Sequence, residues 1–444
     1  MLKYFGINRA IGLALMKRFW SIIAAPMTMV LIAVTLTKAE QGYYFTFTSL
    51  LALQVFFELG LVTVIAQFIS HEFVSLSWGT HGEIIGDLEN RKRVLNILGN
   101  SLKWYFFCSI LLITSLSIAG YLFFFNETNV NISWKLPWLL AVFGVGVNLL
   151  IVPFYAFITG SGDVASVNLR ALIGGILGTL LGWCVLFLGG GLYAIPALTL
   201  GSFSVGIIYL IKSKPILFKQ GIFYALNKME ILHPVSWRHE IWPMQWKIAA
   251  SWISGYFIFQ LFVPVLFKFH GPVVAGQMGM TLSLVNAIQV ICLIWPTSKM
   301  PEFGKFIAQK KWFELDLLFE KTLRHSLEAC LALLTVFLIL LVILENLTNF
   351  SDRFLPTWQM AIFSVSIVAQ LLISNWAIYM RAHKKEPMIL VSAISALLIG
   401  LSTFVSGYYF SSLGMIVGFV LITTIYVLPA TYKLFKNFKR IHHA

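Results

Sequence analysis

Long apolar segments alternate with short polar ones along almost the whole chain. A helix needs roughly 20 consecutive apolar residues to cross a bilayer core about 30 Å thick. By that measure the pattern predicts about twelve membrane-spanning helices, at residues 14–37, 43–69, 102–125, 136–159, 166–189, 191–211, 247–268, 273–297, 323–344, 356–379, 387–409 and 412–432. We therefore expect an all-α polytopic membrane protein.

The two halves of the sequence resemble each other weakly. Two alignments carry the likeness, at offsets of 234 and 222 residues: Gly42 with Gly276, and Asn148-Leu149-Leu150-Ile151 with Gln370-Leu371-Leu372-Ile373. Each half starts on the same side of the membrane and holds an even number of spans, so the repeats would be parallel, related by an axis along the membrane normal. We predict two six-helix bundles, residues 1–213 and 247–444.

Two polar segments between the spans are amphipathic. The first, residues 214–246, is a basic linker rich in aromatic residues and is predicted to lie at the level of the lipid headgroups. The second, residues 299–321, carries apolar residues spaced as a stripe of the same kind: Phe303, Phe306, Ile307, Phe313, Leu315 and Leu318.

Composition agrees with a membrane protein. Of the 444 residues 59% are hydrophobic and only 11% are charged, whereas a soluble domain carries about 25% charged residues. The first apolar run lacks a small-residue cleavage site, so we expect it to remain as a span. The four cysteines all lie in apolar runs, which is typical of small buried side chains rather than of disulfides or a metal site.

The net charge of +14 reflects membrane topology. If the N-terminus is cytoplasmic, 27 of the 32 Lys and Arg residues fall in cytoplasmic segments, four fall outside, and Arg170 lies within a span. This asymmetry follows the positive-inside rule and predicts that both termini are cytoplasmic. The charge thus gives no reason to expect a nucleic-acid partner.

Signatures of enzymatic chemistry are missing from the sequence. It contains no phosphate-binding glycine loop, no HExxH and no paired aspartate motif. Asp87 and Glu89 are interpreted as part of a solvated loop. We expect neither an enzyme nor a cofactor or metal site.

Four cations lie near the predicted cytoplasmic ends of spans: Lys17, Arg18, Arg170 and Lys247. Together they could hold a phosphate or pyrophosphate headgroup, because Arg binds such groups in a bidentate manner and Lys attracts them as a point charge. The alternative is that they are topological anchors whose charged ends reach the membrane surface. The alternative is favoured for Lys17 and Lys247, and both interpretations stay open for Arg18 and Arg170.

Glu58 is the deepest acidic residue, some fifteen residues into the second span. It could bind the proton or sodium ion that drives transport, or it could pair with Arg18 or Arg170 across the bundle. Either role needs partners that the sequence does not reveal.

Uncharged polar residues are also present within the spans. Asn148, Gln260 and Asn286 could contact a sugar, although hydrogen bonds between helices explain most such residues. Four glycines in the fifth span have the spacing of close helix packing: Gly174, Gly175, Gly178 and Gly182.

Several motifs resemble a known family. They are TKAEQGYYFTFTSL after the first span, FELGL in the second, HGPVVAGQMGMTLS around the turn at His270, and Pro301-Glu302-Phe303 after the eighth. The chain resembles polysaccharide biosynthesis membrane proteins of the O-antigen flippase type, within the multidrug/oligosaccharidyl-lipid/polysaccharide (MOP) exporter superfamily. The resemblance covers nearly the whole chain.

The resemblance implies a MATE-like fold, in which two six-helix bundles alternate between inward-open and outward-open states. The implied cargo is an oligosaccharide on undecaprenyl pyrophosphate, carried across the bacterial inner membrane for lipopolysaccharide or other surface polysaccharide. Arg18 and Arg170 are the positions that we map to the cationic cavity residues of such flippases. The implied partners are this lipid-linked oligosaccharide, membrane lipids, and polysaccharide polymerase and chain-length proteins.

Two other functions fit the sequence. A cation-coupled drug antiporter shares the fold and would be expected to place acidic residues deep in the bundle, where this chain offers Glu58. A non-transporting scaffold of a polysaccharide assembly complex would use the basic linker to recruit partners.

Overall fold

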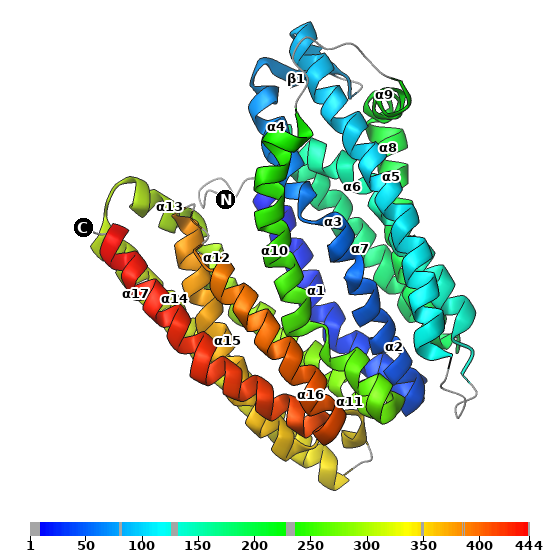
Figure 1. The fold of residues 1–444 in the computed structure, drawn as a ribbon, viewed down its shortest axis with the longest axis vertical. Helices are drawn as coiled ribbons and strands as arrows, with labels where there is room; N and C mark the ends of the chain where they lie inside the picture. Colours follow the sequence, from blue (N-terminus) through cyan, green and yellow to red (C-terminus); the bar gives the residue numbers. More distant parts are fainter. Residues whose placement is uncertain are drawn as a thin grey trace. The chain divides into compact units, whose positions relative to one another are not determined.

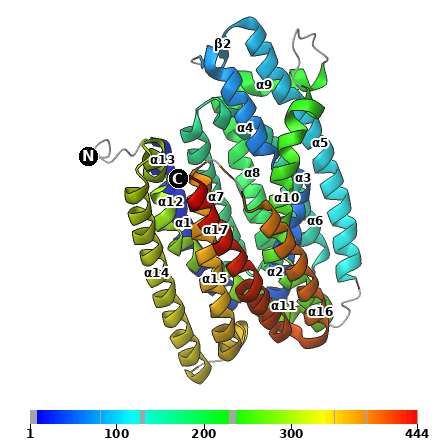
Figure 2. The same ribbon diagram turned by 60° about the vertical axis from the view of Figure 1, so that its left-hand side comes forward.

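The computed structural model describes residues 9–79, 82–125, 132–227, 236–347, 350–383, 385 and 387–442, which are almost entirely helical (Figure 1, Figure 2). The helices are α1 (Arg9–Thr35), α2 (Lys38–Leu51), α3 (Val55–Glu58), α4 (Leu61–Glu72), α5 (Leu88–Phe124), α6 (Lys135–Gly160), α7 (Val164–Phe187), α8 (Ala194–Ser213), α9 (Pro215–Leu226), α10 (Trp242–Phe259), α11 (Phe262–Cys292), α12 (Ile294–Ser298), α13 (Met300–Ala308), α14 (Trp312–Leu347), α15 (Thr357–Ala382), α16 (Ile389–Leu421) and α17 (Leu428–His442). A short antiparallel hairpin, β1 (Leu76–Trp78) with β2 (Ile84–Gly86), precedes α5.

The helices account for the predicted spans. In the described part of the chain nine helical segments are long and apolar enough to cross a membrane, and the bent pair Lys38–Glu58 and Leu61–Ser75 makes a tenth. Two of the nine, Ile248–Cys292 and Ile389–His442, are about twice the length that a bilayer requires. Each contains a backbone break, at Gly271 and at Ser411 respectively, so each holds two spans. The all-α polytopic prediction, with about twelve spans, is confirmed.

Two helices extend well beyond the predicted spans. With 37 and 36 residues, α5 and α14 are each about 55 Å long at 1.5 Å per residue. Hydropathy detects only their apolar parts, but the polar segments before them are also helical. In α5 the helix starts early because the Asp87 side chain accepts a hydrogen bond from the Asn90 amide and caps the first turn.

Packing divides the chain into two compact units. Unit 1 comprises Met1–Ala24, Val34–Leu36 and Leu50–Ile253, and unit 2 comprises Ala25–Ala33, Thr37–Ser49 and Ser254–Ala444. Helices α1 and α2 contribute segments to both units. The division into bundles at residues 1–213 and 247–444 stays a prediction.

In unit 1, α7 and α8 pack closely along their lengths. A Cβ atom on Gly178 would lie 2.6 Å from the Leu198 carbonyl oxygen, and one on Gly182 would lie 3.3 Å from that of Ala194. Side chains at these glycines would therefore push the helices apart. The close packing expected of the glycine spacing in this span is present.

Helix α9 lies within the predicted linker and crosses the long helices α5 and α8, so that Figure 1 shows it end-on. Phe218 of α9 packs on Phe154, with ring centroids 5.4 Å apart. Gly99 of α5 meets the Tyr224 backbone, where a Cβ would approach within 2.7 Å. A helix fixed across the spans in this way has the orientation expected at the headgroup level.

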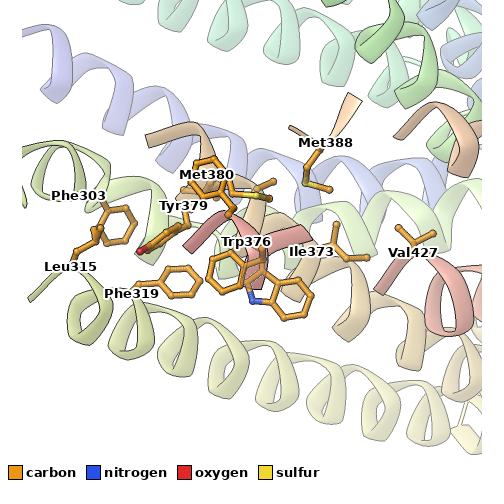
Figure 3. Packing of buried hydrophobic residues seen from close by; sticks show 13 residues of the cluster. Phe303, Leu315, Phe319, Ile373, Trp376, Tyr379, Met380, Met388 and Val427 are labelled. Atoms are coloured by element: carbon orange, nitrogen blue, oxygen red, sulfur yellow. The ribbon is translucent and has the colours of Figure 1, made fainter. Parts of the chain in front are cut away.

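The apolar stripe of residues 299–321 packs against protein. Phe303 and Leu315 are fully buried in a cluster of unit 2 that α15 and α17 also supply, and Phe303 and Phe319 both contact Tyr379 (Figure 3). The prediction that this stripe faces lipid headgroups is wrong for Phe303 and Leu315, because both are buried in a cluster that contains aromatic side chains of α15 and α17. Phe313, by contrast, is 77% exposed.

Helix α2 and the second arm of α11 touch at the glycines that the repeat alignment pairs. A Cβ on Gly42 would collide with the Pro272 carbonyl oxygen, and one on Gly276 would lie 3.3 Å from the Lys38 carbonyl oxygen. Pro272 and Lys38 each precede a paired glycine by four residues, so the contact is reciprocal. Reciprocity is the mark of a two-fold contact, and it supports the alignment of these two helices.

Candidate functional site

Arg170, near the start of α7, is held by three helices of unit 1. Its guanidinium carbon lies 4.1 Å from the ring centroid of Tyr155 on α6, within cation–π range. Its Nη2 donates a hydrogen bond to the Ser202 carbonyl of α8 at 3.3 Å. The ring and the carbonyl fix the position of the guanidinium without neutralising it.

The Arg170 site has hydrogen-bonding capacity that the protein leaves unused. The Arg170 Nε and the Tyr155 hydroxyl are buried and have no hydrogen-bond partner among the described residues. Each such group costs about 1–3 kcal/mol when it is left unpaired. Both can donate a hydrogen bond, so the site is suited to a ligand that presents oxygen acceptors.

Gly206 of α8 makes room for this arrangement. A Cβ atom there would lie 2.5 Å from both the Arg170 Nη2 and the Tyr155 hydroxyl oxygen. Any side chain at this position would therefore displace one of the two groups. The glycine is part of the site although it carries no functional group.

No carboxylate in the described ranges lies within 4.0 Å of the Arg170 guanidinium. The nearest acidic residue in sequence, Asp163, pairs instead with Lys214 at 3.2 Å and caps the start of α7. A cation inside a span costs about 2.5–3.5 kcal/mol even on insertion scales. A charge kept there without a counter-ion is a candidate for binding an anion.

The other predicted cations lie elsewhere. Helix α1 runs beside α7, since the Asn168 amide donates to the Ala10 carbonyl at 3.1 Å. Arg18 and its neighbour Lys17 are exposed on α1. Trp20, two residues after Arg18, has its ring centroid 6.0 Å from that of Trp183. Trp183 is thirteen residues after Arg170, so Arg18 lies further along α7 than Arg170 does. Lys247 is on α10, and its side chain is outside the part that the structure describes.

Glu58 lies at a break in its span. It ends α3, and the next two residues, Leu59 (φ 48°) and Gly60 (φ 66°), adopt left-handed conformations before α4 begins. The two parts of the span are bent by 41°. A Cβ on Gly60 would collide with Ile248 of α10. Discontinuous helices of this kind form ion and substrate sites in transporters, because the interruption frees backbone polar groups within the membrane.

The surroundings of Glu58 contain no positive partner. The residue is half-buried, and it is close enough to Tyr105 of α5 for the two side chains to interact electrostatically. Within the described ranges, no Lys or Arg nitrogen lies within 4.0 Å of its carboxylate. The structure therefore does not show the pairing with Arg18 or Arg170 that the sequence left open.

The three predicted sugar contacts have different surroundings. Asn148 donates from its side chain to the Gly144 and Thr199 carbonyls, at 2.8 and 3.0 Å, and so joins α6 to α8. Gln260 lies at the break between α10 and α11. Asn286 lines a small cavity of unit 2 together with Gln289 and Gln370. A role in binding sugar stays a prediction for all three.

One polar cluster was not expected from the sequence. The buried Gln41 side chain donates to the carbonyls of Gly276 and Arg353, both at 2.9 Å, and Lys38 pairs with Asp352 at 2.7 Å. These contacts join the start of α2 to α11 and to the 3-10 turn Ser351–Arg353. Burial lowers the pKa of the Arg353 guanidinium, and the Glu40 carboxylate opposes that shift. The sequence feature that could have pointed to this cluster is the Glu40-Gln41-Gly42 motif. Its structural role becomes clear only from the contacts.

Comparison with known proteins finds similarity in fold but none in sequence. No protein-family model and no curated protein matches the sequence. Solved structures do match. The MATE multidrug transporter DinF-BH aligns with a TM-score of 0.60 and 14% identity, over 98% of this chain and 96% of that one. The chain has the MATE fold.

Two further structures of multidrug resistance MATE family transporters of the MOP superfamily agree. An inward-facing one matches with a TM-score of 0.58 and 12% identity, over 94% of this chain and 99% of that one. An outward-facing one matches with a TM-score of 0.56 and 12% identity, over 97% and 96%. At such identities the likeness concerns the MATE fold, which hosts more than one cargo, and function must be argued from the site.

Proposed function

We propose that this protein is an alternating-access flippase that moves lipid-linked oligosaccharide, on undecaprenyl pyrophosphate, across the bacterial inner membrane for surface polysaccharide synthesis. One observation carries the proposal. Arg170 is a cation within a span, it has no acidic partner in the described part of the chain, and it lies beside unused hydrogen-bond donors. These features suit an anionic headgroup rich in oxygen.

A pyrophosphate matches the Arg170 site in charge and in hydrogen bonding. Its oxygens can accept from the Arg170 Nε and from the Tyr155 hydroxyl, and its negative charge offsets the guanidinium. A cationic drug would meet repulsion at the same place. The charge of the site therefore favours the glycan carrier over a cationic cargo.

Glu58 has a defined role in this proposal. Because it lies at a break in the span and lacks a cationic partner, it can take up a proton or sodium ion and release it on the other side. The same observation favours the second candidate, a cation-coupled drug antiporter. The structural match to multidrug transporters is compatible with both candidates.

The remaining assignments belong to the same proposal. Both termini face the cytoplasm, and the linker at residues 214–246 joins the two moving bundles at the cytoplasmic surface. The partners are the lipid-linked oligosaccharide, membrane lipids, and polysaccharide polymerase and chain-length proteins. The scaffold alternative would leave the Arg170 site without a purpose.

The test compares variants in a strain that lacks the gene. Surface polysaccharide and lipid-linked oligosaccharide are measured after complementation with wild type, Arg170→Ala, Arg170→Lys and Arg18→Ala at matched expression. Lys212→Ala is the control, because it removes an exposed basic residue at the end of α8. We expect Arg170→Ala to accumulate precursor on the cytoplasmic side, Arg170→Lys to restore part of the polysaccharide, and the control to match wild type.

Two outcomes would contradict the flippase. Normal polysaccharide in the deletion strain, with no redundant flippase, would favour the antiporter, which cation-dependent drug efflux then checks. Full rescue by Arg170→Ala would remove the cationic site from the mechanism and favour the scaffold.

A further inference from the structure

Unit 1 contains an apolar groove of about 420 Å³ whose lining does not include Arg170, Tyr155 or Ser202. Helix α6 packs against both α5 and α8 and forms the floor of the groove between them. Helix α9 also contacts α5 and α8 and lies across one end of the groove (Figure 1). We refer to it as the α9 groove.

The lining of the α9 groove suits a hydrocarbon. Eleven of its twelve described residues are aliphatic or aromatic, so neither a sugar nor a metal ion would find enough polar partners there. Phe106 of α5 and Ile222 and Leu226 of α9 belong to the lining and are also exposed, Leu226 to 79%. Phe106 lies in a membrane-spanning part of α5, where an exposed apolar side chain contacts lipid tails. The groove therefore opens toward the bilayer.

The volume of the α9 groove matches one acyl chain. A methylene group takes up about as much space as a water molecule, which occupies about 30 Å³ in the liquid. A volume of 420 Å³ therefore holds roughly fourteen methylene groups. This is close to the length of a phospholipid acyl chain and far short of an undecaprenyl tail.

Two lysines add positive charge at the α9 groove. Lys103 of α5 belongs to the lining, and Lys219 of α9 precedes Ile222 by three residues, which places both on the same side of that helix. Both lysines are exposed, and in the described ranges no carboxylate lies within 4.0 Å of either ammonium group. Since α9 has the orientation expected at the headgroup level, these charges are suited to a lipid phosphate.

We propose that the α9 groove binds one acyl chain of an anionic phospholipid of the bilayer. The chain lies on the phenylalanines of the lining, and the phosphate lies at Lys103 and Lys219. The interior of a bilayer is as apolar as the groove, so burial of the chain does not discriminate between phospholipids. The lysines do, because each basic residue near an anionic headgroup favours binding about fivefold. The site does not rest on the proposed flippase function.

The first experiment measures lipid retention by the purified, delipidated full chain in a neutral detergent. Native mass spectrometry follows titrations with dimyristoyl phosphatidylglycerol and with dimyristoyl phosphatidylcholine, which have the same chains but differ in net charge. We expect one saturable site that binds phosphatidylglycerol at least tenfold more tightly than phosphatidylcholine. The preference should decrease in high salt, which screens charges that are exposed to solvent.

Charge variants test the headgroup contact. Lys103→Ala should weaken the binding of phosphatidylglycerol about fivefold and leave that of phosphatidylcholine unchanged. Lys103→Ala combined with Lys219→Ala should abolish the preference. Lys436→Ala is the control, because it removes an exposed lysine of unit 2 that is not part of the groove, and it should bind as wild type does.

A steric variant tests the chain contact. Ala225→Trp fills the groove from α9 and should prevent retention of both lipids. Leu177→Trp is its control, because Leu177 is exposed on α7 outside the lining. Melting temperatures without lipid identify a variant that fails to fold, and Ala225→Leu, with a partial loss, then replaces Ala225→Trp.

Three results would overturn the proposal. They are equal retention of the two lipids by wild type, an unchanged preference in Lys103→Ala, and normal retention by a folded Ala225→Trp. Undecaprenyl phosphate is the competitor that tests a different occupant, and displacement of phosphatidylglycerol at a tenfold lower concentration would assign the groove to the carrier lipid instead. Arg170→Ala is expected to bind phosphatidylglycerol normally, so failure of this site and failure of the flippase proposal are distinguishable.

Discussion

The two units differ in the charge of the polar groups that they hold within the spans. Unit 1 contains Glu58 and Arg170, and neither has an opposite charge within 4.0 Å in the described ranges. Unit 2 instead buries neutral amides, such as Asn375, which is fully buried and donates to the Leu371 carbonyl at 2.8 Å. A described charge pair of unit 2, Lys439 with Asp316 at 2.6 Å, lies near helix ends.

This difference separates two uses of polar residues in a membrane. A neutral amide that is hydrogen-bonded within the bundle holds helices together at little cost. An unpaired charge is expensive and is retained where it acts on an ion or a charged ligand. Unit 1 therefore holds unpaired charges within its spans in the described ranges, and unit 2 buries mainly neutral amides.

The largest effect is expected when a charge is placed in the interior of unit 2, which tests whether this unit tolerates only neutral polar groups. Asn375→Asp keeps the shape of the side chain but replaces a buried amide with a carboxyl group. We expect a loss of about 3 kcal/mol of stability, because a carboxylate within a span carries that cost. Thermal unfolding in detergent measures the loss. Asn375→Ala should lose less, and equal losses would show that charge is not what unit 2 excludes.

A steric change in unit 1 tests the close packing of Gly206 against Arg170 and Tyr155. Gly206→Ala inserts a methyl group between Arg170 and Tyr155, and overpacking of this kind costs about 1–3 kcal/mol. We expect lower transport and a lower melting temperature. Tyr155→Phe in the same chain should restore part of the stability, since it removes one of the two polar atoms in conflict and leaves Arg170 Nη2. If Tyr155→Phe does not change the stability of Gly206→Ala, the added methyl group does not clash with the Tyr155 hydroxyl.

Removal of the acidic charge of unit 1 should affect coupling more than folding. Glu58→Gln keeps the shape but cannot bind and release a proton or sodium ion, so we expect roughly a tenfold loss of gradient-driven transport, equivalent to about 1.4 kcal/mol. Transport in vesicles with and without an imposed ion gradient measures it. Glu72→Gln is the control, because Glu72 pairs with Arg93. Equal gradient dependence in wild type and Glu58→Gln would exclude Glu58 as the coupling site.

The smallest effect is expected at an exposed ion pair of unit 2. Lys38→Ala removes the contact with Asp352, and an exposed pair contributes about 0.2–1 kcal/mol. The melting temperature should change little, and less still in high salt. Gln41→Ala should be more destabilising, because it leaves two backbone carbonyls without their donor. If Lys38→Ala were more destabilising than Gln41→Ala, the ion pair rather than the buried amide would account for the stability of this cluster.

The fold was largely predictable because bilayer thickness sets the length of an apolar run. Arg170 could be found for the same reason, since a charge within such a run is conspicuous. Its partners could not, because Tyr155 and Ser202 come from other helices and no spacing links them to Arg170. The break after Glu58 was hidden as well, since Leu59 carries no local signal for a left-handed conformation.

Some sequence patterns had a different meaning in three dimensions. The stripe with Phe303 and Leu315 has the spacing of a membrane-surface helix, yet aromatic residues from distant segments cover it. The motif after the first span holds a capping box, in which Thr37 and Glu40 bond each other's backbone amides. That local signal was readable from sequence, whereas the bonds of Gln41 to Gly276 and Arg353 depend on tertiary structure.

The reciprocal contact of Gly42 and Gly276 limits how the two helices can evolve. Each glycine faces the backbone of the other helix, so neither can acquire a side chain unless both helices separate. A gene that arose by duplication would have inherited the same constraint in both copies. Divergence could then change the lining of either half freely, but it would have to retain these two small residues together.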